Sequence, residues 1–124
     1  MAAALGRIIL YVQDVERLSE FYRQAFAFAL AQHIDGEWAV LDAGACELAV
    51  LKAGPAYRGP VGAGGENNNA KIVFVIDEPI ETVRERLVGL GVDMGAIKSY
   101  RGLTGPLCDG RDPEGNVFQL MQAE

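Results

Sequence analysis

The chain repeats itself, and this internal repeat limits the folds that it can adopt. Arg7–Val12 is a short, largely apolar run followed by a helix start, and Lys71–Ile76 has the same character about 64 residues later. Both runs are rich in β-branched and aromatic residues, which indicates strands. Asp14 can cap a helix after the first run, and Pro79 suits the first turn of a helix after the second. We therefore expect two matched strand–helix units.

Each expected helix carries an apolar stripe at helical spacing, which predicts one buried face. Gly91 supplies a stop for the second helix. The stripes are Val15, Leu18, Phe21, Tyr22, Ala25 and Phe26 in the first helix, and Ile80, Val83, Leu87 and Leu90 in the second.

Three shorter strands are expected after each helix, separated by turns that contain glycine. The pattern is therefore βαβββ twice, which is an α+β fold. The last strands of the two halves also match, since Glu47-Leu48 occupies the place of Gln119-Leu120. The predicted strands are Leu30–Ile34, Glu37–Leu41 and Cys46–Leu51 in the first half, and Ala96–Tyr100, Leu103–Asp109 and Asn116–Met121 in the second.

The segment between the halves is rich in Gly, Pro and Asn and has no apolar periodicity. It predicts a linker, or a loop over a cavity. A phosphate-binding loop is a poorer interpretation, because no Gly-Lys-Ser/Thr follows and no helix begins there. We expect one domain over residues 1–124, with module one at about 5–52, the linker at about 53–69 and module two at about 70–122.

Composition excludes several classes of protein. With 124 residues, half of them hydrophobic and 23% charged, the chain is expected to be globular rather than disordered. A net charge of −6 argues against nucleic acid as a partner. No apolar run approaches the roughly 20 residues of a membrane span, and no secretory signal is expected. Cys46 and Cys108 lack CxxC spacing, so free thiols in a reducing cytoplasm are predicted.

Two motifs flank the repeat. Leu10–Arg17, which leads to Phe21-Tyr22, is a strand, an Asp and a helix start, and residues 112–116 read Asp-Pro-Glu-Gly-Asn before the final strand. Together they resemble the vicinal oxygen chelate superfamily, which includes glyoxalase I, extradiol dioxygenases, fosfomycin-resistance proteins and bleomycin-resistance proteins. The resemblance covers almost the whole chain. It implies an open, curved, mixed sheet around a cavity, with the helices outside, and a homodimer.

In metal-dependent members of that superfamily, the first and last strands of each module supply the metal ligands. By the motifs, the resemblance places these positions at Arg7, Glu47, Lys71 and Gln119. Only Glu47 is a good ligand, because arginine stays protonated, lysine must first lose a proton, and a Gln carbonyl binds transition ions weakly. His33, the only histidine, lies off this set. No metal and no other cofactor is therefore expected.

The residues at these positions predict a charged cluster in the place of an ion. Arg7, Glu47 and Lys71 are expected to form a cation–anion–cation group with Gln119 at its edge. Such a cluster either replaces the metal as a structural link between the modules or uses its spare positive charge to bind an anionic or polar ligand group. The sequence leaves both alternatives open.

Strand alternation predicts which other side chains face the cavity. Residues on the faces of Arg7, Glu47, Lys71 and Gln119 point inward, and the opposite faces pack under the helices. Three aromatic residues, Trp38, Tyr57 and Tyr100, are candidates to line or cover the pocket. The inward residues are Ile9 and Tyr11, Ala49 and Leu51, Val73 and Val75, and Val117 and Met121.

We expect a metal-free protein that binds a small molecule, of the glyoxalase/bleomycin-resistance type, with ligand contacts from Arg7, Glu47, Lys71, Gln119, Tyr11, Trp38, Tyr100 and Met121. One alternative is a divergent lyase or isomerase with Glu47 as base and Lys71 or Arg7 as electrophile. A carboxylate beside two cations favours its ionised form, which makes it a poor general base. Another is a metal held by Glu47, His33 and Asp42. A non-catalytic regulatory module is a third class.

Overall fold

A computed structural model describes residues 2–54, 70–99, 102 and 105–123 of the chain. The chain divides into two compact units, Met1–Pro60 and Val61–Glu124, and the division falls inside the segment expected to link the modules. Most of that segment, residues 55–69, lies outside the described residues, as do the candidates Tyr57 and Tyr100. Neither described helix has the length and apolar character of a membrane span.

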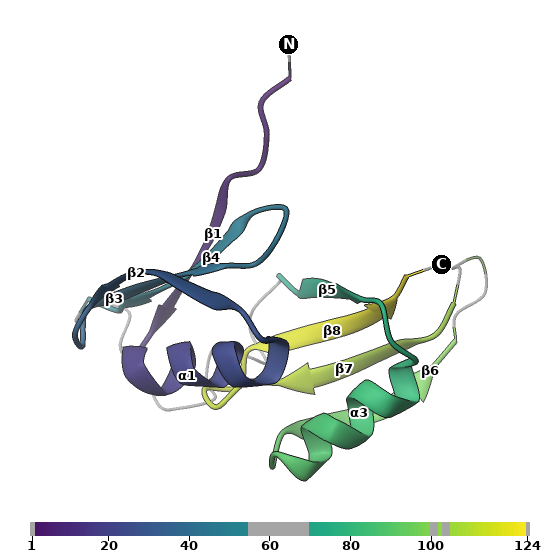
Figure 1. Cartoon of the computed structure of the whole chain (residues 1–124). Helices are drawn as coiled ribbons and strands as arrows, with labels where there is room; N and C mark the ends of the chain where they lie inside the picture. The colour runs from purple at the N-terminus through teal and green to yellow at the C-terminus, as the bar shows by residue number, and fades with distance from the viewer. Residues whose placement is uncertain (1, 55–69, 100–101, 103–104, 124) are drawn as a thin grey trace. The chain divides into compact units, whose positions relative to one another are not determined.

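Unit 1 is one βαβββ module (Figure 1). Its four strands form a sheet in the order β1-β4-β3-β2, with β1 parallel to β4 and the other neighbours antiparallel. The elements are β1 (Arg7–Val12), α1 (Val15–Phe26), β2 (Ala29–Ile34), β3 (Trp38–Asp42) and β4 (Glu47–Lys52).

Unit 2 repeats this arrangement, which confirms the duplicated βαβββ pattern (Figure 1). Its sheet has the order β5-β8-β7-β6, again with one parallel pair, β5 and β8. The elements are β5 (Ile72–Ile76), α3 (Ile80–Gly89), β6 (Asp93–Lys98), β7 (Leu107–Arg111) and β8 (Val117–Gln122). The predicted bounds of two strands were wrong at both ends: β6 begins three residues before Ala96 and ends at Lys98, and β7 begins four residues after Leu103 and ends at Arg111.

The helix α1 begins and buries its stripe as predicted. The side chain of Asp14 accepts a hydrogen bond from the Arg17 backbone N–H and so caps the first turn. The buried face contacts β3 and β4, and Phe21 and Phe26 at its margin are only partly buried. The helix ends at Ala27, which adopts the left-handed conformation at φ 59° that glycine usually takes. Its buried residues are Val15, Leu18, Ser19, Tyr22 and Ala25.

The helix α3 follows Pro79, which stands at its N-cap. Ile80, Val83 and Leu87 are buried, and the helix contacts β6, β7 and β8. Leu90, expected in the stripe, is 49% exposed because it lies at the C-cap, past the last helical residue. Gly91 then turns the chain at φ 85°, a conformation that favours glycine.

Each sheet has one face under its helix and one open face. Along β1, Ile8, Leu10 and Val12 are the more buried residues, and Arg7, Ile9 and Tyr11 are exposed. The alternation is the same along β5, where Val73 and Val75 are exposed. Burial therefore alternates along β1 and β5 as predicted, whereas Leu48, Ala49 and Val50 of β4 are all buried.

Both modules interrupt their ladder at an equivalent place. The register of β2 against β3 shifts between Leu30 and Gln32, and that of β6 against β7 shifts between Met94 and Ile97. In the second case, Gly95 and Ala96 together oppose the single residue Asp109, which is the pattern of a β-bulge. Each bulge lies on a strand at one edge of its sheet.

Gly110 is expected to be intolerant of a side chain. A Cβ there would lie 2.5 Å from Cζ of Phe118 and 2.6 Å from Sδ of Met94, and Phe118 is itself 1% exposed and cannot move aside easily. We expect Gly110→Ala to lower the free energy of unfolding by about 1–3 kcal/mol, as overpacking of a core does. Urea denaturation followed by circular dichroism measures this.

Gly89→Ala is the matched control. Gly89 is the last residue of α3, and a Cβ there meets nothing within 4 Å. Because alanine has the higher helix propensity, this variant is expected to gain up to about 1 kcal/mol. Equal effects of the two substitutions would contradict the packing at Gly110.

Candidate functional site

In unit 1, Arg7 and Glu47 lie side by side on the open face. They are register partners in the parallel pair of β1 and β4. Both Nε and Nη2 of Arg7 donate to Oε1 of Glu47, at 3.0 and 2.8 Å. The side chains are 34% and 38% exposed, so the pair remains in contact with solvent. The structure therefore brings together the two predicted residues of this module.

Trp38 joins the same face. The guanidinium carbon of Arg7 lies 5.1 Å from the centroid of the Trp38 ring, within the range of a cation–π contact. Trp38 opposes Leu51 across the β3–β4 ladder, and Leu51 opposes Tyr11 across the β1–β4 ladder. Tyr11 is 61% exposed. Of the predicted contacts, Arg7, Glu47, Tyr11 and Trp38 thus share one surface.

In unit 2, Lys71 and Gln119 meet at a residue that the sequence analysis did not single out. Nζ of Lys71 donates to Oδ2 of Asp109 at 2.9 Å, and Nε2 of Gln119 donates to Oδ1 of the same carboxylate at 3.0 Å. Asp109 and Gln119 are register partners of β7 and β8. Met121, the last predicted contact, lies level with Leu107 and Val75 on the same face.

The expected cation–anion–cation group of Arg7, Glu47 and Lys71 draws on both units and stays a prediction. Within unit 1 Arg7 forms an ion pair with Glu47, and within unit 2 Lys71 forms one with Asp109. The internal repeat of the sequence could have indicated Asp109. Asp42 opposes Glu47 in module one just as Asp109 opposes Gln119 in module two, so both modules place an acid at this point of the third strand.

The environment of Asp109 acts on its carboxyl in two directions. Burial raises its pKa, and the hydrogen bonds from Lys71 and Gln119 lower it, with help from the charges of Lys71 and Lys98. The net result is a pKa below the usual value. Because the favourable contacts prevail, Asp109 is held as a carboxylate that organises the two donors.

A small pocket opens beside this carboxylate, entirely within unit 2. The bulge in β6 places Gly95 and Ala96 opposite Asp109, and these small residues leave room above the sheet. The cavity volume is about 60 Å³. The lining residues are Gly95, Ala96, Lys98, Leu107, Asp109 and Gln119.

The side chains at the four implied metal positions do not suit a divalent transition ion. Arg7 has only donors, and it occupies the Glu47 oxygen with two N–H groups. Lys71 and Gln119 both use their nitrogens as donors toward Asp109. An ion at either place would have to displace a cation or break these contacts.

The alternative metal set of Glu47, His33 and Asp42 is not assembled. Within β3, Asp42 and Ala39 lie three residues apart and so point to opposite faces. Asp42 is level with Glu47, and Ala39 is level with His33. His33 therefore projects from the face that α1 covers, away from Glu47.

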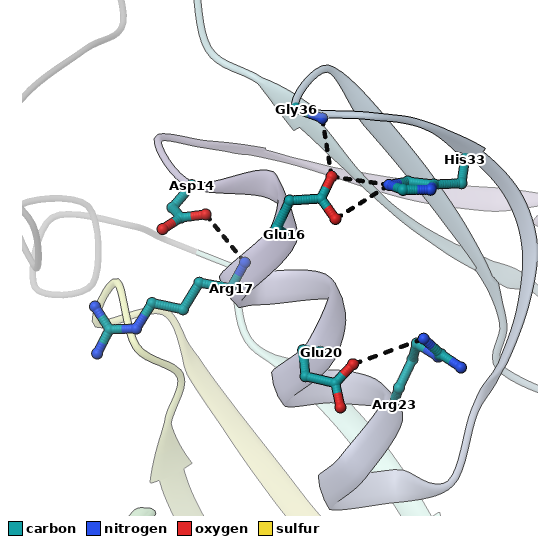
Figure 2. A network of polar contacts seen from close by, with 7 residues as sticks. All are labelled: Asp14, Glu16, Arg17, Glu20, Arg23, His33 and Gly36. Carbon is teal, nitrogen blue, oxygen red and sulfur yellow. Dashed lines mark hydrogen bonds and ion pairs between the residues drawn. The ribbon is translucent and has the colours of Figure 1, made fainter.

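There His33 contacts Glu16 of α1, as Figure 2 shows. Nε2 of His33 lies 2.8 and 3.1 Å from the two Glu16 oxygens, and Oε1 also accepts from the Gly36 backbone N–H at 2.8 Å. The bond from Gly36 and then that from His33 lower the pKa of Glu16. Asp35 brings a further ligand atom within 4.8 Å of these two side chains, but all three are exposed. The contacts tie α1 to the β2–β3 turn.

Comparison with known proteins identifies the family. A family model described as "Glyoxalase/Bleomycin resistance protein/Dioxygenase superfamily" matches residues 4–120. No curated protein sequence gives a match.

Solved structures with this fold include proteins of different activity. FosX, a fosfomycin resistance protein from Listeria monocytogenes, has a TM-score of 0.78 at 18% identity, with 100% of this chain and 96% of the other covered. Lactoylglutathione lyase from Agrobacterium tumefaciens has a TM-score of 0.76 at 17% identity, with 98% and 95% covered. TnmS3, an antibiotic binding protein from Streptomyces sp. CB03234, has a TM-score of 0.74 at 21% identity, with 99% and 98% covered. At these identities the likeness establishes the fold alone.

The pKa of Asp109 is expected to depend on Lys71. In the Lys71→Met variant, burial still raises the pKa of Asp109 but the ammonium donor is lost, so the carboxyl should titrate at higher pH than in the wild-type protein. Carboxyl carbon shifts followed by NMR measure this. Lys52→Met is the control, because Nζ of Lys52 donates instead to the Gln13 carbonyl.

The same shift gives stability a pH dependence of known sign. Since the folded pKa lies below the usual 3.8, ionised Asp109 stabilises the fold above that value, and the contribution is lost as the pH falls through the folded pKa. The difference in unfolding free energy between wild type and Asp109→Asn should therefore shrink on acidification below about pH 4. A difference that grows in acid would contradict this assignment.

Proposed function

Because the chain belongs to the Glyoxalase/Bleomycin resistance protein/Dioxygenase superfamily, we propose that the open faces of its two sheets bind a small organic molecule without a metal ion. The observation that carries this proposal is the set of contacts made by the residues at the four implied metal positions. Arg7, Glu47, Lys71 and Gln119 hold ion pairs and hydrogen bonds on open sheet faces, among exposed apolar side chains. A few polar groups in an apolar surround are typical of small-molecule sites.

Energetics favour a ligand over a purely structural role for these charges. The side chains of Lys71 and Asp109 are 43% and 44% exposed, and those of Arg7 and Glu47 are only slightly less so. Ion pairs at such exposure contribute about 0–1 kcal/mol to stability. A ligand that covers them would exclude water and strengthen their electrostatic interactions.

Apolar residues on the open faces supply the remaining contact surface. Ile9 and Tyr11 of β1 and Val73 and Val75 of β5 are all exposed, although strand positions of this kind usually gain stability by burial. Trp38 adds an aromatic ring held by Arg7. TnmS3, whose fold is similar, is an antibiotic binding protein, so this architecture is compatible with sequestration of a drug or metabolite.

An enzymatic role has less support from the site. One oxygen of Glu47, Oε1, already accepts two N–H groups of Arg7, and Lys71, a candidate electrophile, is paired with Asp109. A general base must be within reach of the proton that it removes and free to accept it.

The remaining expectations complete the proposal. A homodimer is the expected assembly, and light scattering of the purified protein tests it. Cys46 and Cys108 are free thiols in the structure, which accords with a reducing compartment such as the cytoplasm.

Ligand binding is measurable without a label, because Trp38 is the only tryptophan and lies on an open face. Its emission should change when planar aromatic compounds bind, and calorimetry gives the affinity. In Val75→Ser, which alters a side chain that is 62% exposed on the open face of β5, binding should weaken roughly five- to tenfold.

Val88→Ser is the matched control, because Val88 is 48% exposed on α3 and not on a sheet face. It should leave the affinity unchanged. If no compound of cavity size binds, or if the two variants weaken binding equally, the proposal is wrong.

The metal-free state has its own test. Protein purified without chelators should contain less than about 0.1 equivalent of zinc, nickel, manganese or iron by elemental analysis, because Glu47 is the one good ligand among the four positions and it is paired with Arg7. A stoichiometric amount of any of them would refute the metal-free site.

A further inference from the structure

We propose that the pocket of unit 2 binds an oxyanion, so that the ligand is an organic molecule with a carboxylate or phosphonate group on an apolar body. This inference rests on the proposed function and specifies its ligand class. The pocket is the one lined by Gly95, Ala96, Lys98, Leu107, Asp109 and Gln119.

The first argument is the balance of charge. Lys98 lines the pocket, and Nζ of Lys71 lies 2.9 Å from Oδ2 of Asp109 at its wall. Because Lys71, which is not a lining residue, balances the charge of Asp109, the ammonium of Lys98 is left as the unbalanced charge of the pocket. Asp93 and Arg111, which are register partners at the other end of β6 and β7, have opposite signs and do not alter this balance.

The second argument is the supply of hydrogen-bond donors. An ammonium group has three N–H donors, and the bond to Asp109 uses one of those on Lys71. Both Asp109 oxygens already accept a bond, Oδ1 from Gln119 and Oδ2 from Lys71. The side chain of Asp109 is thus committed to holding the donors, and it acts as a positioning residue.

The third argument is size and shape. The cavity of about 60 Å³ is small, and it has room for a compact polar group such as a carboxylate or a tetrahedral phosphonate. Gly95 and Ala96 at the bulge lack long side chains that would fill this space. Beyond the pocket, Val73 and Val75 offer the exposed apolar surface for the rest of the molecule.

The open face of unit 1 has the opposite balance. Arg7 is level there with two carboxylates, Glu47 on β4 and, across the next ladder, Asp42 on β3. Of the two open faces, each considered by itself, only that of module two has an excess of positive charge. This asymmetry decides between an anionic and a cationic ligand group at the pocket.

Four probes that share a naphthalene ring test the inference. Two are anions, 1-naphthoate and 1-naphthylphosphonate, one is neutral, 1-naphthalenemethanol, and one is a cation, 1-naphthylmethylammonium. Calorimetry at 50 mM salt should show the two anions binding at least about tenfold more tightly than the neutral alcohol, with the cation weakest. Whichever anion binds more tightly distinguishes the carboxylate from the phosphonate class.

Variants separate binding from structure. Lys98→Met should reduce the preference for the anions by about tenfold, and Arg23→Met on α1, which removes a positive charge elsewhere, should not. A residue with only a structural role would instead weaken binding of all four probes.

The outcomes distinguish this inference from the proposed function. If all four probes bind equally, the oxyanion pocket is refuted and small-molecule binding stands. A second outcome is that none of the four probes binds, but acetate or inorganic phosphate shifts the amide NMR resonances of Ala96 and Gln119, and Lys98→Met abolishes the shift. In that case the oxyanion pocket is supported and the proposed binding of larger molecules is refuted. If neither the probes nor the simple anions bind, both are refuted.

Discussion

Parallel pairing between the first and last strands of each module is the constraint on which the rest of the structure depends. The pairs β1–β4 and β5–β8 join segments about 40 residues apart in sequence and make one strand of each pair central in its sheet. Because side chains alternate strictly along each strand, this pairing decides which residues share the open face. A shift of one residue would send Arg7 under the helix and Ile8 into solvent.

The two modules share this strand pairing but differ in the charged residues on their open faces. In module one, Arg7 of the first strand forms an ion pair with Glu47 of the last strand. In module two, Lys71, directly before the first strand, forms an ion pair with Asp109 of the third strand. The position on the last strand that is acidic in module one is the neutral donor Gln119 in module two. The exchange of a carboxylate for an amide at this position, together with Lys98 on β6, reverses the sign of the charge balance on the open face.

Much of this arrangement could be predicted from the sequence, because it follows from local signals and the repeat. The cap at Asp14, the stop at Gly91 and the alternation along β1 are each encoded within a few residues. The partner of Lys71 could not be predicted in the same way. It depends on which residue of β7 lies level with Gln119 across the regular β7–β8 ladder, and the bulge at Gly95 and Ala96 that opens the pocket beside Asp109 lies in the separate β6–β7 ladder. An isolated glycine in a strand is a weak signal for such a bulge.

The bulges also bear on how the protein behaves at high concentration. An exposed sheet edge with a regular row of unpaired backbone groups can recruit a strand from another molecule, and an irregular edge resists this. In each sheet, one edge strand, β2 or β6, carries a bulge, whereas the register of the other edge strand, β1 or β5, is regular throughout. The edges β2 and β6 are therefore poorer templates for a strand of another molecule than β1 and β5.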